Sequence, residues 1–345
     1  MTGNTLGWVI VAFVLYLLMM IAIGAFYAKG NNNSEDYFLG GRKLNGFVAA
    51  LSAQASDMSG WLLMGLPGAI YLTGVGGDGW IAIGLFIGTT LNWLFIATKL
   101  RRYTIRANNS VTLPTYFENR FHDDKKVLMT VSSITIVVFF LVYCASALSA
   151  GGQLFESVFG IDYHVALTIG ALVVLVYTFL GGFTAVCVTD FIQGMLMLVG
   201  ILAVPLFAYH FLTGNGTTLA AGLEASGADS ANFLNLMKNG DGSNNIISVI
   251  SGLGWGLGYF GMPHILVRFM AVRDEKEMTK SKATAISWVA LSLGFAVFIG
   301  ILGRAYLPEL VNGNNEKVFI EMIKKVFTVE MRAPFIAGLF LCGIL

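Results

Sequence analysis

The chain has 345 residues, of which 56% are hydrophobic and 12% are charged, and its formal net charge is +1. A soluble domain carries about twice that charged fraction, so the composition excludes an ordinary soluble protein and indicates an all-α polytopic membrane protein. The near-neutral charge, without a block of basic residues, gives no reason to expect nucleic acid as a partner. No nucleophile–base pattern, phosphate loop or metal-ligand spacing occurs, so we expect neither an enzyme nor a cofactor.

Apolar segments of about the length that crosses a bilayer follow one another along the chain. A membrane helix needs about 20 mostly apolar residues. The segments lie at residues 6–26, 47–73, 79–98, 127–159, 165–180, 183–212, 246–271 and 284–306. A ninth begins at Pro334 and reaches Leu345 after about twelve residues, which is too few to span a bilayer. We therefore expect the sequence to be truncated within its ninth span and the natural chain to continue.

Basic residues are distributed unevenly between the loops. Lys and Arg gather in or beside the loops that follow the first, third and seventh segments, whereas the second and fourth loops contain none. Arg268, at the end of the seventh segment, is counted with its loop. Because positively charged loops stay in the cytoplasm, we expect these loops inside the cell and the amino terminus outside.

Two longer loops are then expected on the outer side. Residues 213–245 are rich in Gly, Asn, Ser and Ala, and their run at 239–245 superficially resembles a calcium loop. The ligand pattern and its closing Glu are missing, so we interpret this stretch as a flexible loop. Residues 318–327 are amphipathic, which predicts a short helix lying over the outer face.

The second apolar segment contains a carboxylate, Asp57, near its middle. Placing Asp at the centre of a membrane helix costs about 2.5–3.5 kcal/mol on insertion scales, so such a residue is a functional candidate. Ser, Gln and Gly residues surround it between Ser52 and Gly60, and Pro67 follows. We interpret the segment as an interrupted helix whose freed carbonyls and carboxylate hold a cation. The alternative is an ordinary span whose polar patch packs against its neighbours.

The seventh segment contains Trp-Gly-Leu-Gly-Tyr-Phe-Gly-Met-Pro at residues 255–263. Its glycines weaken a helix and Pro263 interrupts one, so we predict a second broken membrane helix. Trp255 and Tyr259 share one helix face, which can cover an apolar ring and attract a cationic amine. The alternative is close helix packing through glycine, with the aromatic rings filling gaps; Gly84 and Gly88 also fit such packing.

Two further residues within apolar segments are candidates. Asp190, near the start of the sixth segment, is either an ion ligand or gate, or a charge at a helix N-terminus that the dipole favours. Periodicity alone makes Tyr143 a core residue. The four histidines and three cysteines show no metal or disulfide spacing, and no histidine lies at a predicted site.

Four stretches resemble the sodium/solute symporter family, and above all its bacterial proline-transporting branch. They are Leu-Gly-Gly-Arg at 39–42, Leu-Ser-Ala-Gln-Ala-Ser-Asp-Met-Ser-Gly-Trp-Leu-Leu-Met-Gly-Leu-Pro at 51–67, Tyr-Thr-Phe-Leu-Gly-Gly at 177–182 and Trp-Gly-Leu-Gly-Tyr-Phe-Gly-Met-Pro-His at 255–264. The likeness runs over essentially the whole chain. It implies a transporter that couples inward Na⁺ movement to L-proline uptake by alternating access, in the plasma membrane of a bacterium.

The resemblance also implies a LeuT-like core made of two inverted five-helix repeats. Residues 1–345 would form one transporter domain, incomplete at its carboxyl end. An extra helix would occupy residues 1–30, the first repeat residues 45–212 and part of the second repeat residues 246–345. The two interrupted helices would then be the first helices of the two repeats.

Site residues follow from the same resemblance. Na⁺ would be held by the backbone carbonyls of Ala55 and Met58, with Asp57 beside them and Asp190 linked with a further ion site or with gating. The hydroxyl ligands that complete this site would lie beyond Leu345. Proline would meet residues of both broken helices and one neighbour: Ser59, Tyr143, Trp255, Tyr259 and Pro263. Arg42 would take part in coupling Na⁺ movement to proline uptake.

The sequence departs from the family pattern at Met262, which replaces the Gln expected before Pro263 and leaves the polarity of that position open. Two other functions compete with proline symport. One is Na⁺-coupled uptake of another small solute, such as an osmolyte or another amino acid, on the same scaffold. The other is a membrane sensor or channel; the sequence shows neither a soluble signalling domain nor a continuous polar pore.

Overall fold

The computed structural model describes residues 3–30 and 33–344. Within these residues the chain is helical apart from turns and two isolated β-bridges, Leu44 with Val272 and Lys238 with Asn244. The predicted all-α class is therefore confirmed for the described part of the chain.

Five spans in this part are long and apolar enough to cross a membrane. They are α1 (Gly3–Ala28), α5 (Val75–Leu91) continued through η3 (Asn92–Ala97) and α6 (Thr98–Arg106), α8 (Val127–Phe159), α9 (Tyr163–Gly214) and α14 (Glu275–Tyr306). Each long helix coincides with an expected apolar segment, and α9 contains two of them. Gly182 separates these two because its φ of 61° and ψ of −160° interrupt the helical geometry, a conformation that glycine adopts without a Cβ clash.

Two further segments consist of broken helices, and the second of them is long and apolar enough to be a sixth span. The first joins α3 (Gly46–Gly60), η2 (Trp61–Gly65) and α4 (Leu66–Thr73). The second joins α12 (Ile246–Gly254), η4 (Trp255–Gly261) and α13 (Pro263–Ala271), and its two parts are bent by 46°. These are the two interruptions that the sequence predicts.

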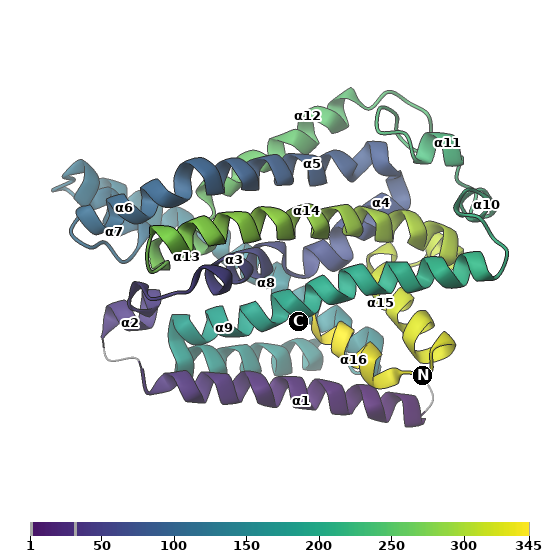
Figure 1. The fold of residues 1–345 in the computed structure, drawn as a ribbon, viewed down its shortest axis with the longest axis horizontal. Helices are drawn as coiled ribbons and strands as arrows, with labels where there is room; N and C mark the ends of the chain where they lie inside the picture. Colours follow the sequence, from purple (N-terminus) through teal and green to yellow (C-terminus); the bar gives the residue numbers. More distant parts are fainter. Residues whose placement is uncertain (1–2, 31–32, 345) are drawn as a thin grey trace.

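The long helices α1, α5, α9 and α14 run along the longest axis of the molecule, and α3 lies in its interior (Figure 1). The α3 helix packs against α9, α13 and α14, while α12 packs against α5. The close approach of α5 to α12 and η4 requires glycine on both sides. A Cβ atom on Gly84 would lie 2.3 Å from the Gly252 carbonyl oxygen, and one on Gly88 would lie 2.2 Å from that of Gly256. The predicted close packing at Gly84 and Gly88 is thus confirmed.

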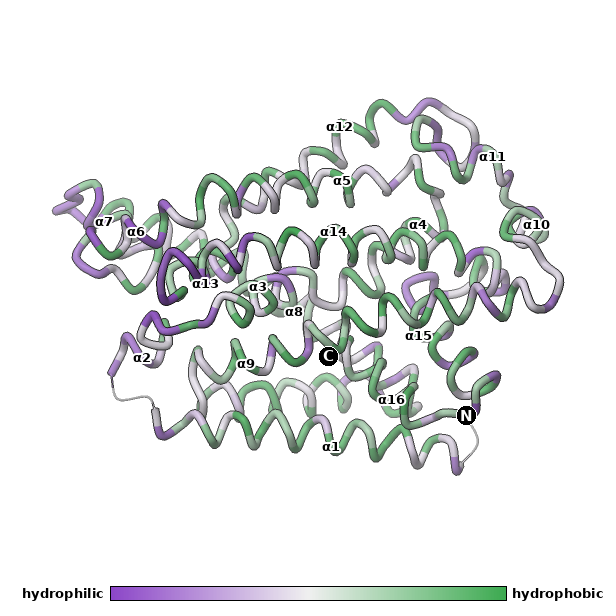
Figure 2. Tube along the Cα trace, in the orientation of Figure 1, coloured by the Kyte–Doolittle hydropathy of each residue, from purple (hydrophilic) through white to green (hydrophobic). Residues whose placement is uncertain are grey.

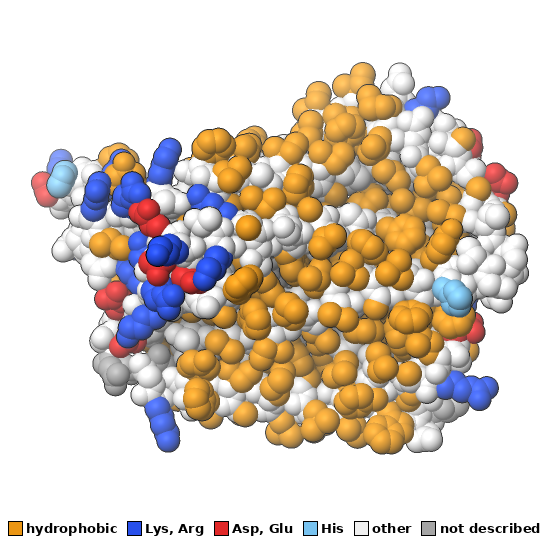
Figure 3. Space-filling view, viewed as in Figure 1, with side chains coloured by type: hydrophobic (Ala, Val, Ile, Leu, Met, Phe, Trp, Pro, Cys, Tyr) orange, Lys and Arg blue, Asp and Glu red, His pale blue; other side chains and the backbone are white. Residues whose placement is uncertain are grey.

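Hydropathy and charge divide the molecule along the same axis. The helical segments are mostly hydrophobic between more hydrophilic ends (Figure 2). Lys and Arg side chains gather at one end, near α2 (Ser34–Leu39), α6, α7 (Leu113–Phe121) and α13 (Figures 1 and 3). We call this end, where the three basic loops meet, the basic end. An apolar middle with one basic end is the charge pattern of a protein that spans a membrane in one orientation.

The loops contain more helix than the sequence predicts. Residues 213–245 include α10 (Leu219–Ala225) and α11 (Ser230–Phe233), so reading the whole stretch as a flexible loop was wrong. Capping explains both helices, since the side chains of Thr218 and Asp229 accept hydrogen bonds from the first backbone N–H groups. The amphipathic segment forms α15 (Val318–Ile323) and η7 (Lys324–Glu330), as predicted. The last helix is α16 (Pro334–Cys342).

Candidate functional site

The break in the first interrupted helix lies at Ser59. Its φ of 43° and ψ of −157° depart from the helix, and a positive φ is uncommon for any residue other than glycine. Beyond it, the N–H of Trp61 donates to the carbonyl of Met58, and the chain continues as the π-helical turn η2. Residues held in such conformations cluster at functional sites, where the surrounding structure compensates for the strain.

The break in the second interrupted helix lies at Met262 and Pro263. The helix first tightens into the 3₁₀ segment η4, and Met262 is then extended, with φ of −79° and ψ of 104°. Pro263 begins α13 at a position where its missing N–H costs nothing. The run of glycines therefore has two consequences, because it permits both the break and the contact with α5.

A cavity of about 540 Å³ lies where the two breaks meet. We call it the central cavity. Its size is within the range of about 300–1,000 Å³ that is usual for small-ligand sites. Its lining comes from the broken helices, α5 and α8: Asp57, Met58, Ser59, Trp61, Leu85, Tyr143, Ser146, Ala147, Gly254, Trp255, Gly258, Tyr259 and Met262.

Asp57 supplies the carboxylate of the central cavity. The hydroxyl of Tyr259, across the cavity on η4, donates a hydrogen bond to Asp57 Oδ2. His264 Nε2 lies 3.8 Å from Asp57 Oδ1, and neither ring nitrogen of His264 has a hydrogen-bond partner among the described residues. A neutral hydroxyl stabilises the carboxylate without cancelling its charge, so this corner of the cavity favours a cation.

Aromatic rings form much of the remaining wall. Trp255 stacks on Trp61 with ring centroids 5.6 Å apart and an interplanar angle of 23°. Tyr143 stacks on His264 at 5.2 Å and donates its hydroxyl hydrogen to the Ser56 carbonyl, at 2.6 Å. Aromatic faces of this kind can cover an apolar ring and attract an organic cation. The cavity thus combines a carboxylate with flat apolar surfaces.

Asp190, a predicted ion-site residue, does not line the central cavity. Its Oδ2 lies 2.7 Å from Nη2 of Arg268 and accepts hydrogen bonds from Ser52 and Ser56. Arg268 is only 5% exposed and also donates to both serine hydroxyls. Counting Arg268 among the loop charges was therefore wrong. A buried ion pair needs such additional hydrogen bonds, because both ions are removed from water.

The remaining predicted residues are spread along α3, α13 and the basic end. Ala55 lies one turn before the break and faces α9, where a Cβ on Gly194 would be 3.4 Å from the Ala55 Cβ. Pro263 starts α13 and does not line the cavity. Arg42 is buried at the basic end, where it donates to the Met270 and Ser110 carbonyls, at 2.8 Å each. Arg42 therefore contacts the end of α13 rather than the cavity.

Backbone contacts at the basic end join the α3 and α13 halves of the broken helices. The N–H of Leu44 donates to the Ala271 carbonyl at 3.1 Å, and the N–H of Arg273 donates to the Leu44 carbonyl at 3.0 Å. The Arg101 guanidinium donates to the carbonyls of Val272 and Arg273. Together these bonds fix the start of one broken helix to the end of the other.

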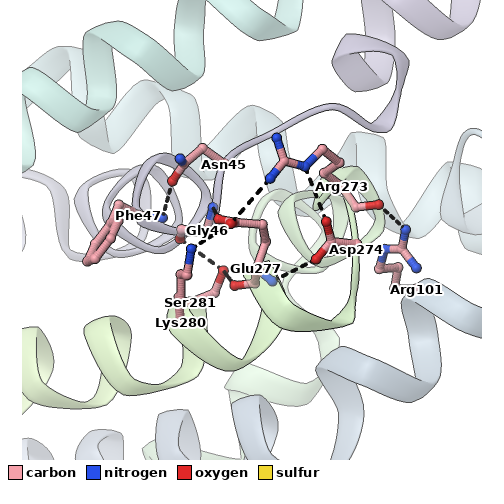
Figure 4. A network of polar contacts seen from close by, with 9 residues as sticks. All are labelled: Asn45, Gly46, Phe47, Arg101, Arg273, Asp274, Glu277, Lys280 and Ser281. Atoms are coloured by element: carbon pink, nitrogen blue, oxygen red, sulfur yellow. Dashed lines mark hydrogen bonds and ion pairs between the residues drawn. The ribbon is translucent and has the colours of Figure 1, made fainter.

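Glu277, in the first turn of α14, reinforces this junction (Figure 4). Its side chain is buried, and its Oε2 accepts a hydrogen bond from the N–H of Gly46 at 2.7 Å, the first residue of α3. Ser281 donates from its hydroxyl to the Gly46 carbonyl at 2.9 Å. Nearby, the Glu277 N–H donates to Asp274 and holds the pKa of that carboxyl below its usual range. Glu277 thus supplies an anionic cap to the N-terminus of α3.

Three residues that belong to these sites were missed in the sequence. Trp61 lies in the motif that drew attention to Asp57, and its spacing from Asp57, four residues, could have placed it on the same face. His264 directly follows the predicted break at Pro263, but a lone histidine gives no indication of its partner. Arg268 gave the weakest signal, since an arginine at the end of an apolar segment is typical of a loop.

Comparisons with known proteins show the family of this chain. A model described as "Sodium:solute symporter family" matches residues 37–345. The chain is 43% identical over 342 residues to the sodium/proline symporter of Escherichia coli (strain K12), covering 97% of this chain and 65% of that protein. It is 42% identical over 338 residues to the sodium/proline symporter of Staphylococcus aureus (strain JH9), covering 97% and 63%. The chain therefore spans slightly less than two thirds of the length of these relatives.

The fold is also similar to that of a solved structure. It is a Na⁺-coupled sialic acid symporter in a substrate-bound, outward-open state, with a TM-score of 0.77 and 19% sequence identity. The alignment covers 98% of this chain and 71% of that one. This likeness confirms the predicted LeuT-like, all-helical fold.

Proposed function

Because this chain belongs to the sodium:solute symporter family, a family of transporters rather than enzymes, we propose that it is the core of a secondary transporter that couples inward Na⁺ movement to L-proline uptake. The observation that carries the proposal is the central cavity. It places one buried carboxylate beside two stacked indole rings, at the point where two membrane helices are broken. Interrupted helices at mid-membrane provide ion and substrate sites in such transporters.

Na⁺ is assigned to the break in α3. The backbone oxygens of Ala55 and Met58 would coordinate the ion, and the Asp57 carboxylate would attract it. Ala55 and Met58 lie in the turn that ends at Ser59, where the helix geometry is lost. Asp190 is assigned to gating or to a further ion site, and its pairing with Arg268 supports a gating role in which the pair must rearrange.

Proline is assigned to the central cavity beside this ion. As a zwitterion with an apolar ring, it would place the ring against Trp255 and Trp61 and its carboxylate towards the backbone at the start of the half-helix that follows Ser59. Ser59, Tyr143 and Tyr259 would surround it. Pro263 would act indirectly, by fixing the break that brings Tyr259 into the cavity.

The repeats, the orientation and the role of Arg42 belong to the same proposal. The first repeat would run over residues 45–212 and the second would begin at residue 246, each starting with a broken helix; α1 would precede both. The basic end would face the cytoplasm of a bacterium, with the amino terminus outside. Arg42 would couple the sites to the cytoplasmic side, because it holds the end of α13.

Uptake of labelled proline by the full chain in proteoliposomes tests the proposal. An inward Na⁺ gradient is expected to drive accumulation, and a K⁺ gradient of the same size is the control. Unlabelled amino acids and betaine-type osmolytes are added as competitors. Accumulation of one of those solutes, but not of proline, would support the alternative substrate on the same scaffold. Sodium-independent uptake would contradict the coupling.

A further inference from the structure

A groove opens on the side of the molecule near the basic end, where α3 packs between α9 and α14 (Figure 1). It measures about 820 Å³ and is separate from the central cavity, since the two have no lining residue in common. We call it the side groove. Its lining includes Phe47, Leu51, Phe191, Met195, Trp288 and Leu291.

The side groove is apolar and open towards the membrane. Phe47, Met195 and Leu291 are each about half-exposed. The indole of Trp288 is buried in the floor, where its Nε1 donates to the Gly194 carbonyl at 3.2 Å and joins α14 to α9. Side chains exposed on membrane-spanning helices contact lipid tails, because the bilayer core contains no water.

The length of the groove matches one leaflet of a bilayer. Along α14 its lining runs from Ala283 to Leu291, or about 12 Å at 1.5 Å per residue. Half of the hydrocarbon core is about 15 Å thick. The groove begins near the basic end, because Asn45 directly precedes α3 and Ala283 lies about two turns after the start of α14. A lipid whose headgroup lies at the basic end can therefore lay one acyl chain along it.

Two lysines precede the groove on the same face of α14. Lys276 and Lys280 are four residues apart, and Thr284 and Ser287 of the lining continue the series at helical spacing. Lys280 Nζ lies 2.8 Å from Glu277 Oε1, but an ammonium group has three donors and can bind a phosphate as well. None of the ion pairs formed by the described residues includes Lys276. Two cations are therefore available where the groove begins.

Uncharged hydrogen-bond donors lie between these lysines and the apolar part of the groove. Asn45 lies with Lys280 beside the start of α3 (Figure 4). Its Oδ1 accepts from the Phe47 N–H at 2.8 Å, and its Nδ2 donates to none of the described residues. The hydroxyls of Thr284 and Ser287 also form no hydrogen bond with the described residues. Phosphate and ester oxygens are acceptors, so they complement these donors.

We propose that the side groove binds an anionic phospholipid, with its phosphate between Lys276 and Lys280 and one acyl chain along the groove to Trp288. A zwitterionic lipid fits less well, because its own cationic group offsets the attraction of the lysines. The bound lipid would cover Phe47, at the start of the helix whose break contributes to the central cavity. This inference goes beyond the proposed function and does not depend on which solute is transported.

Quenching of Trp288 fluorescence by brominated lipids tests the proposal, since bromine on an acyl chain quenches an indole that it contacts. The full chain is placed in phosphatidylcholine bilayers with increasing fractions of brominated phosphatidylglycerol or, separately, brominated phosphatidylcholine. The signal of Trp288 is the difference between the wild type and Trp288→Phe. Phosphatidylglycerol should quench it half-maximally at a fraction about fivefold to twentyfold lower than phosphatidylcholine, because each lysine near the membrane surface favours an anionic lipid about fivefold.

Substitutions separate the headgroup contacts from the acyl-chain contact. Lys276→Gln and Lys280→Gln should each reduce the preference for phosphatidylglycerol about threefold to fivefold, and the double variant should abolish it. Lys99→Gln is the matched control, since it removes the same charge from α6 at the same end, outside the groove, and should leave the preference unchanged. Ser287→Phe fills the groove and should reduce quenching of Trp288 by both lipids.

Two results would overturn the site. Equal quenching by the two lipids, or an equal effect of Lys99→Gln, would show that no specific headgroup contact exists. Trp288 fluorescence that neither lipid quenches would show that protein, such as a second copy of the chain, covers the groove. Proline uptake does not enter any of these measurements, so the proposed function is tested separately.

Discussion

Asp57 places a charge where a membrane helix has lost its regular hydrogen bonds, and its partner Tyr259 is neutral. Asp57→Asn keeps the shape and the acceptor for Tyr259 but removes the charge. A carboxylate about 6 Å from a bound cation contributes roughly 3 kcal/mol at an effective dielectric constant of about 20, or about a hundredfold in affinity. We expect the Na⁺ concentration for half-maximal proline uptake to rise by about that factor. A variant with the sodium dependence of the wild type would contradict the role of Asp57.

The two aromatic residues of η4 have separable roles. Trp255 is stacked on Trp61 and half-exposed, whereas Tyr259 is buried and donates to Asp57. Trp255→Ala should therefore weaken proline binding about fivefold, since an aromatic contact contributes about 1 kcal/mol, with little change in Na⁺ affinity.

Tyr259→Phe is the complementary change, because it keeps the ring and removes the donor to Asp57. It should alter the apparent Na⁺ affinity more than the affinity for proline. Titrations of uptake against each solute separate the two effects. Equal losses of both affinities in both variants would show that the rings only maintain packing.

At the scale of single elements, the positions of the two breaks could be predicted because their causes are local. The small polar residues around Asp57 weaken the first helix, and the glycines before Pro263 weaken the second. Both effects are independent of how the rest of the chain folds. The Asp190–Arg268 pair could not be predicted in this way. Its members are 78 residues apart on α9 and α13, and their distance depends on how those helices pack against α3. The role of Glu277 could not be predicted either, because it accepts a hydrogen bond from Gly46 only when the start of α3 lies beside it.

The contact between α5 and η4 can be tested by replacing one glycine, Gly88. Gly88→Ala would place a methyl group against the Gly256 carbonyl, so α5 and η4 must separate, at a cost of about 1–3 kcal/mol. Because η4 carries Trp255 and Tyr259, we expect reduced thermal stability and weaker proline binding in the same variant.

Gly294→Ala on α14 is the control for this variant, since nothing lies within 4 Å of its added Cβ. Alanine within a helix should leave the melting temperature equal or slightly higher. Equal melting temperatures of the two variants would show that the close approach at Gly88 does not contribute to stability.

At the scale of the whole molecule, the basic end brings together segments distant in sequence. Arg42, Leu44 and Glu277 connect the loop before α3, the end of α13 and the start of α14. The proposed alternating access would require the halves of the broken helices to move, and these bonds would have to break when that end opens. They join buried backbone groups and buried charged side chains, which water can solvate once that end is exposed.

The same end fixes the expected orientation in the membrane. Because Arg268 is buried, it no longer counts among the basic residues of the loops. The remaining Lys and Arg still gather at this end (Figure 3). The positive-inside rule then predicts that Lys276, in the first turn of α14, faces the cytoplasm and that Thr217, before α10, faces outward. In a full chain in which Cys144, Cys187 and Cys342 are replaced by serine, Thr217→Cys in intact cells should react with a membrane-impermeant maleimide. Lys276→Cys should react only after the cells are opened. The reverse pattern would place the basic end outside, and α4 and α15 would then face the cytoplasm.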